Sequence, residues 1–535
     1  IKFHPGVNED LGATSVWGSQ QLHLGKGATH DGVVGMWYGK GPGVDRSIDV
    51  IKHANAAGTS KHGGVLAFAG DDHACKSSTL PHQSEYAFMH SLVPVLHPAG
   101  IEDGLFLGLH GIAMSRFSGC WTGFKIISEF ADSSASVFSD PFTLSFNTPT
   151  DIEIPRDGLN IRWYDPPLEQ EKRLINFKLP AATAYARANG LDRYTINPAK
   201  KRLGIISTGK GWMDTMQALS DLGITPKRAE ELGIAVYKVA LVWPLDMQGI
   251  QHLAEQVEEL LIVEEKRGVM EEQIRSHLYH MPADRRPRVT GKTDERGAPL
   301  LPEHYELSVL QIAEAIVARL KTITDVAPFA KRLDIYNRNS SVRGKPAPVA
   351  RLPYFCSGCP HNTSTKVPEG SRALAGIGCH YMATWIRPEY TGPFTQMGGE
   401  GAPWIGQAPF TTEKHIFANL GDGTYFHSGL LAIRAAVAAK INITYKILYN
   451  DAVAMTGGQH VDGELSVPMI IDQVAAEGVK QIRIVTDQPE KYQGIPLRGN
   501  IAVDHRDNLD KIQKEMREVE GTTIPVSYTH LTLPT

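Results

Sequence analysis

Two stretches of the last third of the chain carry residues that could hold a metal ion and an anion together. Gly421-Asp422-Gly423 follows an apolar segment, residues 416–420, and Asn450 follows a second apolar segment. Since the carboxyl ends of parallel strands share one edge of a sheet, the Asp422 and Asn450 side chains would meet there, and their oxygens suit Mg²⁺. The glycines let backbone N–H groups approach a phosphate, and the helix expected after them presents its positive end. The stretch therefore predicts a βαβ unit that binds a diphosphate with Mg²⁺.

Three cysteines could bind a second inorganic group. Cys356 and Cys359 form a Cys-x-x-Cys pair, and Cys379 follows in a Gly-Ile-Gly-Cys-His segment. Thiolates in this pattern bind either an iron–sulfur cluster or Zn²⁺, for which His361 or His380 could supply a fourth ligand. A redox-active cysteine pair and buried thiols without a ligand are the other interpretations. The residues alone leave these alternatives open.

The pattern from Gly421 to Asn450 resembles the thiamine diphosphate motif. Its continuation, Ala454-Met-Thr-Gly-Gly-Gln459, resembles a segment of the 2-oxoacid:ferredoxin oxidoreductases. The resemblance implies that thiamine diphosphate is the cofactor and that Asp422, Asn450 and the backbone carbonyl of Ala452 coordinate Mg²⁺. It also implies that further residues bind the cofactor: Gly421, Gly423, Thr424, Thr456 and Gly457. On the residues alone, Asn450 could simply form a turn at the end of a strand.

The start of the chain resembles the pyrimidine-binding domain of indolepyruvate ferredoxin oxidoreductases, specifically the long fused bacterial form. Three segments carry this resemblance, which covers about residues 1–524: Val7-Asn-Glu9, Gly39-Lys-Gly-Pro-Gly-Val44 and Gly70-Asp-Asp-His73. It implies that Glu9 is the catalytic carboxylate that hydrogen-bonds N1′ of the thiamine aminopyrimidine. The plain alternative is a carboxylate in the first turn of a helix over residues 11–24, with Asn8 as its cap.

The same resemblance favours a [4Fe–4S] cluster bound by Cys356, Cys359 and Cys379. A cluster needs four thiolates, and the fourth is expected beyond residue 524. A further polar group follows the predicted strand 64–70, where it could line a substrate pocket, bind a metal ion or form a solvated loop. Its members are Asp71, Asp72, His73, Ser77, Ser78 and His82.

The elements that must position these residues alternate short apolar strands with helices, which predicts an α/β fold. The resemblance divides it into three domains: a pyrimidine-binding domain (1–150), a transketolase C-terminal-like domain (160–330) and a diphosphate-binding domain with the cysteine motif (350–524). We expect parallel sheets with helices on both faces. In the second domain, segments 202–208, 233–241 and 260–264 read as strands, and residues 280–300 as a loop.

Composition excludes several classes of protein. The 535 residues carry 54 Lys and Arg against 58 Asp and Glu without a basic block, so nucleic acid is not an expected partner. No apolar run approaches the roughly 18 residues of a membrane span, so no membrane association is expected. Five cysteines and the absence of a signal-like start indicate a reducing cytoplasm.

Residue 1 is Ile, so we expect the natural chain to begin upstream. Residues 525–535 break the preceding pattern and read as a non-native tail.

The resemblance implies oxidative decarboxylation of an aryl 2-oxoacid, such as indolepyruvate, to acyl-CoA and CO₂ with reduction of ferredoxin. The expected partners are thus the 2-oxoacid substrate, coenzyme A and ferredoxin, and a homodimer is expected by analogy. A non-oxidative thiamine diphosphate decarboxylase or ligase is the alternative enzyme, which would have no use for the three cysteines. A zinc-stabilised, non-catalytic assembly subunit is the alternative from another class.

Overall fold

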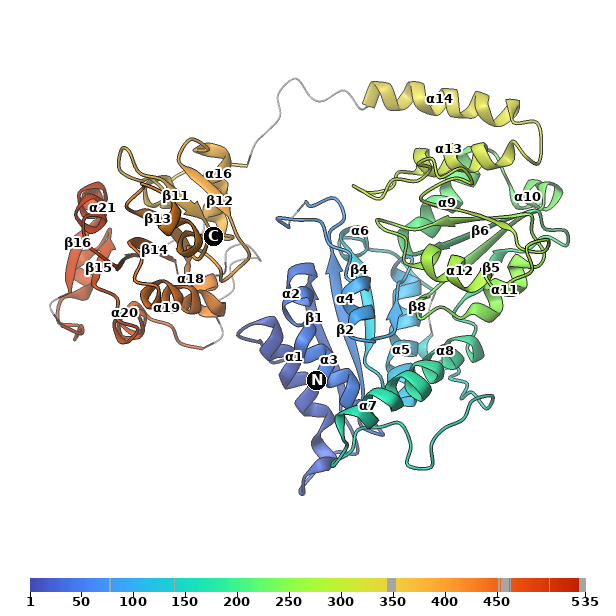
Figure 1. Ribbon diagram of the computed structural model, residues 1–535, viewed down its shortest axis with the longest axis horizontal. Coiled ribbons are helices and arrows are strands. Elements are labelled where there is room, and N and C mark those ends of the chain that lie inside the picture. The colour runs from blue at the N-terminus through green and yellow to red at the C-terminus, as the bar shows by residue number, and fades with distance from the viewer. Residues whose placement is uncertain are drawn as a thin grey trace. The chain divides into compact units, whose positions relative to one another are not determined.

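The computed structural model of the protein describes residues 1–76, 78–138, 140–343, 353–450, 453, 461, 463–499 and 501–528. It consists of two compact units (Figure 1), which we treat separately. The N-terminal unit comprises residues 9–345, and the C-terminal unit comprises residues 1–8 and 346–535. Both contain largely parallel sheets covered by helices, as the α/β pattern predicts.

The first sheet of the N-terminal unit has the strand order β1-β2-β4-β3-β8. Its strands are β1 (Val34–Lys40), β2 (Gly64–Asp71), β3 (Val95–Leu96), β4 (Thr122–Ile127) and β8 (Leu241–Trp243). All pairs are parallel except β3 with β8. The helices around it include α1 (Glu9–Gln20), α2 (Gly41–Arg46), α3 (Ile48–Ala57), α4 (Glu85–His90), α5 (Ile101–Ser118), α6 (Ser128–Ala131), α7 (Pro167–Arg173) and α8 (Leu179–Ala188).

The second sheet of this unit has the order β10-β9-β6-β7-β5. Its strands are β5 (Arg193–Ile196), β6 (Leu203–Thr208), β7 (Ile234–Val239), β9 (Glu259–Val263) and β10 (Arg288–Thr290). Strands β6, β7 and β9 are buried along their whole length, which suits a parallel sheet covered on both faces. The helices are α9 (Gly209–Asp221), α10 (Pro226–Leu232), α11 (Met247–Ala254), α12 (Met270–Leu278), α13 (Val309–Leu320) and α14 (Ala327–Arg343). Strand β10 lies in the stretch for which we expected only a loop.

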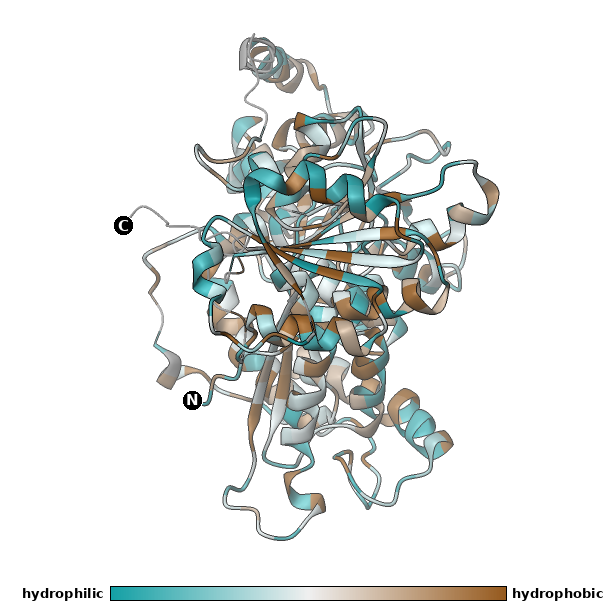
Figure 2. Ribbon diagram, turned by 90° about the vertical axis from the view of Figure 1, so that its left-hand side faces the viewer, coloured by the Kyte–Doolittle hydropathy of each residue, from teal (hydrophilic) through white to brown (hydrophobic). Residues whose placement is uncertain are grey.

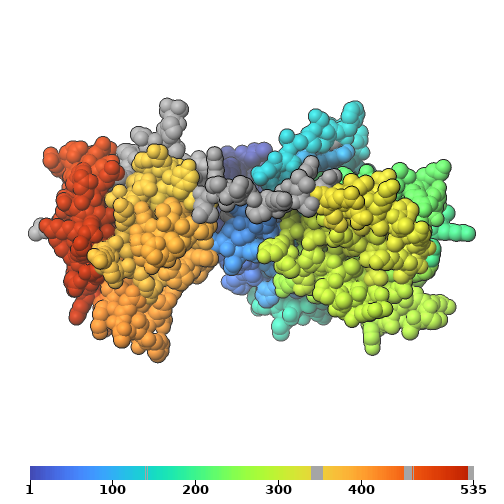
Figure 3. All heavy atoms as spheres, turned by 90° about the horizontal axis from the view of Figure 1, so that it is seen from above, coloured from blue at the N-terminus to red at the C-terminus, as the bar shows by residue number. Residues whose placement is uncertain are grey.

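The C-terminal unit is built on one sheet with the order β12-β11-β13-β14-β17-β15-β16, whose described pairs are all parallel. Its strands are β11 (Ala373–Ala375), β12 (Thr391–Phe394), β13 (Ile416–Gly421), β14 (Ile443–Tyr449), β15 (Gln481–Thr486), β16 (Ala502–His505) and β17 (Thr522–Tyr528). The helices include α15 (His361–Ser364), α16 (Ala383–Ile386), α17 (Pro403–Gln407), α18 (Asp422–Thr424), α19 (Leu430–Ala438), α20 (Val467–Ala476) and α21 (Leu509–Arg517). In the space-filling view the red residues towards the end of the chain lie directly beside the orange residues of the same unit (Figure 3).

Hydrophobic burial explains why β13 and β14 lie at the centre of this sheet. Every residue of β14 is buried, and β13 is buried up to its last residue. Colouring by hydropathy shows hydrophobic residues on strands, with hydrophilic residues on parts of the helices that cover them (Figure 2). The two strands therefore form a rigid base for whatever follows their carboxyl ends.

Strand β17 includes the start of the stretch that reads as a non-native tail. Pro525–Tyr528 belong to this strand, between β14 and β15. Ile524 and Val526 are fully buried in the core, so the strand extends past the change in sequence pattern. Residues 529–535 lie outside the described residues. No helix in the described part of the chain has the length and apolar character needed to cross a bilayer.

Candidate active site

The structure brings the Asp422 and Asn450 backbones together at the carboxyl edge of the C-terminal sheet. Strands β13 and β14 pair in parallel, and the backbone N–H of Asn450 donates to Oδ2 of Asp422 at 3.0 Å. The other carboxylate oxygen, Oδ1, accepts the N–H of Gly423 at 2.9 Å. Asp422 is only 4 % exposed. A buried carboxylate fixed by two backbone donors is well suited to present its remaining lone pairs to a divalent cation.

The predicted Gly-Asp-Gly turn is shorter than expected, because a helix begins at Asp422 itself. Helix α18 continues into a π-helical turn, Tyr425–Gly429, and then into α19. The amides of this first turn thus lie directly after β13, where an anion would meet them. Gly423 faces Val453, and Thr424 is buried. The chemistry of the residues fits a metal-bound diphosphate.

Three of the predicted cofactor-binding residues, Ala452, Thr456 and Gly457, lie outside the described residues. Their roles stay predictions.

Glu9 is the first residue of α1 in the N-terminal unit. The indole N–H of Trp37 donates to its carbonyl oxygen at 2.9 Å, and its side chain lies against Gly43 in α2. A Cβ at Gly43 would lie 2.6 Å from Cγ of Glu9, so only glycine leaves room for this side chain. The Gly-Pro-Gly segment and Glu9, two parts of the sequence resemblance, therefore meet in space. The role of Glu9 towards a cofactor stays a prediction.

The three cysteines lie close enough to influence one another. Burial raises the pKa of Cys379, and the charges of Cys359 and Cys356 raise it further. The N–H of Cys359 donates to the carbonyl of Cys356 at 3.0 Å, and the Asn362 side chain donates to the carbonyls of both. The donor set fits three ligands of an iron–sulfur cluster. The other two cysteines, Cys75 and Cys120, belong to the N-terminal unit.

A single-ion zinc site has less support. Among the residues described, no three His, Cys, Asp or Glu side chains converge closely enough to hold one metal ion. His380 is fully buried behind glycines, and Nδ1 of His361 lies 3.4 Å from the hydroxyl of Ser364. A four-iron cluster holds its thiolates around a larger core, so its ligands need not converge this closely.

Glu400 is a buried carboxyl that the sequence analysis missed. Its Oε2 accepts the N–H of Gly398 at 2.8 Å, and the backbone N–H of Ile377, near Cys379, also bonds to it. Its Oε1 is buried without a hydrogen-bond partner among the described residues. The only signal in the sequence was an acidic residue set among glycines, Gly398-Gly-Glu-Gly401, and glycine-flanked acids are common in loops.

Burial raises the pKa of Glu400 from its ordinary value of 4.5 to about 7. Between these pH values the folded chain binds the proton that the unfolded chain has released, so the free energy of unfolding falls as pH rises. Glu400→Gln keeps the shape of the side chain but removes the group that titrates. At pH 8 we expect it to stabilise the C-terminal unit by up to about 3 kcal/mol, with little effect at pH 5. Hydrogen exchange of peptides from β13 measures this difference.

Glu520→Gln is the matched control, since Glu520 is exposed. Its effect should be small at both pH values. An equal effect of Glu400→Gln at pH 5 and pH 8 would contradict the prediction.

Asp71, Asp72 and His73 of the polar group that follows β2 are buried, and Ser78 and His82 are half-buried. Asp71 accepts hydrogen bonds from the backbone and hydroxyl of Ser84, and Lys125 lies between Glu85 (2.6 Å) and Asp71 (3.6 Å). The Nε2 atom of His73 is buried with no hydrogen-bond partner in the described structure. These contacts argue against the solvated-loop interpretation. Ser77 lies outside the described residues.

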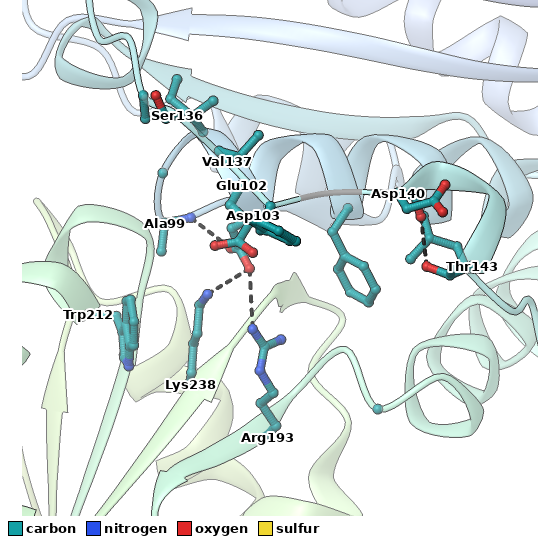
Figure 4. Close-up of a pocket in the computed structure, with 17 residues that line it drawn as sticks. Ala99, Glu102, Asp103, Ser136, Val137, Asp140, Thr143, Arg193, Trp212 and Lys238 are labelled. Atoms are coloured by element: carbon teal, nitrogen blue, oxygen red, sulfur yellow. Dashed lines mark hydrogen bonds and ion pairs between the residues drawn. The ribbon is translucent and has the colours of Figure 1, made fainter.

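A hollow of about 710 Å³ lies elsewhere in the N-terminal unit (Figure 4). Asp103 accepts the N–H of Ala99 at 2.8 Å and pairs with Lys238 at 2.7 Å and with Arg193 at 3.6 Å. The cations in the lining are thus already paired with a carboxylate. None of the predicted site residues lines this hollow, so we assign it no ligand.

Two family models match parts of the chain. One, described as "Indolepyruvate oxidoreductase domain", matches residues 193–333, and the other, "Thiamine pyrophosphate enzyme, C-terminal TPP binding domain", matches residues 376–486. The second range contains Cys379, Asp422 and Asn450. The region that matches the thiamine pyrophosphate model therefore contains the carboxyl-edge site described above.

Curated relatives agree with these matches. "Indolepyruvate oxidoreductase subunit IorA" of Thermococcus kodakarensis is 26 % identical over 61 % of this chain and 48 % of its own length. IorA of Methanothermobacter marburgensis is 24 % identical over 86 % of this chain and 69 % of its own. The chain thus spans about half the length of the Thermococcus relative. A solved structure, a 2-oxoglutarate:ferredoxin oxidoreductase from Magnetococcus marinus, shares 12 % identity with a TM-score of 0.39 over 60 % of this chain and 57 % of that one.

Proposed function

We propose that this chain, which resembles the indolepyruvate oxidoreductases and contains a region matching a thiamine pyrophosphate-binding domain, takes part in the oxidative decarboxylation of a 2-oxoacid. The substrate is an aryl 2-oxoacid of the indolepyruvate kind, the acyl group passes to coenzyme A, and ferredoxin accepts the electrons. The cofactors are thiamine diphosphate, Mg²⁺ and a [4Fe–4S] cluster. The active protein is a homodimer.

The observation that carries the proposal is the fixed Asp422 carboxylate at the end of β13, with the backbone of Asn450 bound to it. Bound thiamine diphosphate supplies a carbon nucleophile and an electron sink for loss of CO₂. The chain's own contribution is to hold Mg²⁺ through Asp422 and Asn450 and the diphosphate through the first turn of α18. Glu9 would hold a proton at N1′ of the aminopyrimidine. Cys356, Cys359 and Cys379 would keep a one-electron carrier near this edge of the sheet.

Replacement of Glu9 tests the catalytic assignment. Glu9→Gln keeps the size of the side chain but removes its charge and basicity, so we expect decarboxylation to slow by about 10²–10⁴-fold. Binding of thiamine diphosphate should change much less, because Glu9 holds neither the diphosphate nor the metal in this proposal. Proton exchange at the thiazolium C2, followed by NMR in the full-length protein, separates activation of the cofactor from later steps.

Asp10→Asn is the matched control for Glu9. Asp10 is the next residue of α1 and lies 3.5 Å from Arg46 in a partly exposed ion pair. Such pairs contribute little, so its rate should stay near that of the wild type. Equal C2 exchange in Glu9→Gln and the wild type would refute the role of Glu9.

The non-oxidative decarboxylase or ligase is the second candidate. It would use the same Asp422 site, and it would leave the proximity of the three cysteines unexplained. An assay of products distinguishes the two candidates: the oxidative enzyme would reduce ferredoxin, whereas the non-oxidative decarboxylase would release an aldehyde.

A further inference from the structure

His380 follows Cys379 directly, and its imidazole lies in a cage made by three glycines. A Cβ at Gly376 would overlap Nε2 of the ring. A Cβ at Gly378 would lie 2.7 Å from Cε1, and one at Gly421 would lie 3.1 Å from the same atom. His380 as a whole is 1 % exposed. The missing side chains of these glycines therefore make the space that the imidazole fills.

The cage connects the two candidate sites of this unit. Gly421 is the last residue of β13 and precedes Asp422. On another side, the His380 ring lies 6.0 Å from the ring of His361, at an interplanar angle of 86°. His361 opens the helix that follows Cys359. One rigid ring thus lies among the Cys379 loop, the Cys-x-x-Cys segment and the turn that would bind the diphosphate.

The surroundings of His380 do not favour a role in proton transfer, because the residue is buried away from solvent. Its Nε2 atom and both polar atoms of the Asn419 amide are buried without a hydrogen-bond partner among the described residues. An imidazole held this way acts through its shape and its dipole.

We infer that His380 is a positioning residue that couples the cysteine segment to the Gly-Asp-Gly turn, so that occupancy of the thiamine site changes the electronic environment of a cluster held by Cys379. The inference rests on the proposed function. Protein interiors are close-packed. If Gly421 is displaced when Asp422 binds the metal and the diphosphate, the His380 ring must either move with Gly421 or oppose its displacement. Such coupling is reciprocal: reduction of the cluster would change the affinity for the cofactor by the corresponding factor.

The test compares full-length protein, purified without oxygen, before and after addition of thiamine diphosphate and Mg²⁺. The readouts are the EPR spectrum of the reduced cluster and its midpoint potential, neither of which requires turnover. In the wild type we expect the cofactor to shift both. In His380→Leu, which keeps an apolar side chain of moderate size but removes the ring, we expect iron content and cofactor binding to persist while the shifts are lost.

Gly376→Ala is the second variant, since the added methyl group would displace the intact ring, and we expect the same loss. His415→Leu is the matched control. His415 is also buried and hydrogen-bonds Thr444 at 2.7 Å, but it precedes β13, at the opposite end from Gly421. The His415→Leu variant should retain the cofactor-dependent shifts of the EPR spectrum and the midpoint potential.

The outcomes separate the inference from the proposed function. A wild-type protein that binds no iron overturns the proposed electron transfer and the inference with it. A wild type with a cluster and a cofactor-induced shift that persists in folded His380→Leu and Gly376→Ala overturns the inference alone. A wild type whose cluster shows no shift with the cofactor also overturns the inference and leaves the proposed function standing.

Discussion

Replacement of Asp422 by alanine is expected to weaken binding of thiamine diphosphate by roughly 100-fold or more, since losing one member of a buried charged pair costs about 3–5 kcal/mol. The change removes a metal ligand. It also leaves the N–H groups of Asn450 and Gly423 without their acceptor. Because the carboxylate is proposed to act through Mg²⁺, the loss should be largest with the metal present. Calorimetric titration with the cofactor, with and without Mg²⁺, measures it.

Asp510→Ala is the control for this titration. Asp510 lies on α21 of the same unit in an exposed ion pair with Lys514, so its removal should leave affinity unchanged within error. Unaltered affinity in a folded Asp422→Ala variant would show that the carboxyl edge of β13 is not the diphosphate site.

Replacement of Cys356 by alanine is expected to abolish cluster binding. Protein purified without oxygen should carry about four irons and four sulfides per chain, and the variant should lose nearly all of both. Cys356 is exposed and Cys359 half-buried, so the variant should remain folded. Iron and acid-labile sulfide assays give the content, and EPR of the reduced protein identifies the cluster.

Cys120→Ala is the matched control for the loss of a thiol. Cys120 is fully buried in the N-terminal unit, so the variant should keep its iron even if it is less stable. Zinc in place of iron in the wild-type protein would refute electron transfer and favour a structural zinc domain or a non-oxidative enzyme.

The sequence predicts those parts of the site whose positions depend on residues close together in the chain, such as an apolar strand and the residue that follows it. Strand β14 ends at Tyr449, directly before Asn450, as the apolar segment before Asn450 predicts, and the residues after two adjacent parallel strands must meet. This is why the proximity of Asp422 and Asn450 follows from the sequence. The α/β fold likewise follows from alternating apolar segments, and its assignment to a thiamine-binding fold follows from the motif.

The residues that the sequence did not reveal act through contacts between distant segments. Glu400 becomes unusual because the fold buries it, with Ile377 of a distant segment bonded to its carboxyl, and the glycines beside it in the sequence do not predict that burial. The cage around His380 requires Gly421, which is far from Gly376 in the chain and joins it only through the pairing of β11 with β13. Strand β17 likewise owes its place in the sheet to pairing with β14 and β15, which lie far from it in the sequence.

One strand from the second half of the N-terminal unit belongs to the first sheet, and this limits how the unit can be divided into recombinant fragments. Strand β8 comes from the second half of the unit but pairs with β3 of the first sheet, and the N–H of His97 donates to the carbonyl of Ala240. A recombinant fragment that ends near residue 150 would lack β8 and leave β3 as an unpaired edge strand. Such a strand can pair with other molecules, which leads to aggregation. The complementary fragment would carry a strand without its sheet. Soluble expression of this half of the protein therefore requires both sheets on one polypeptide.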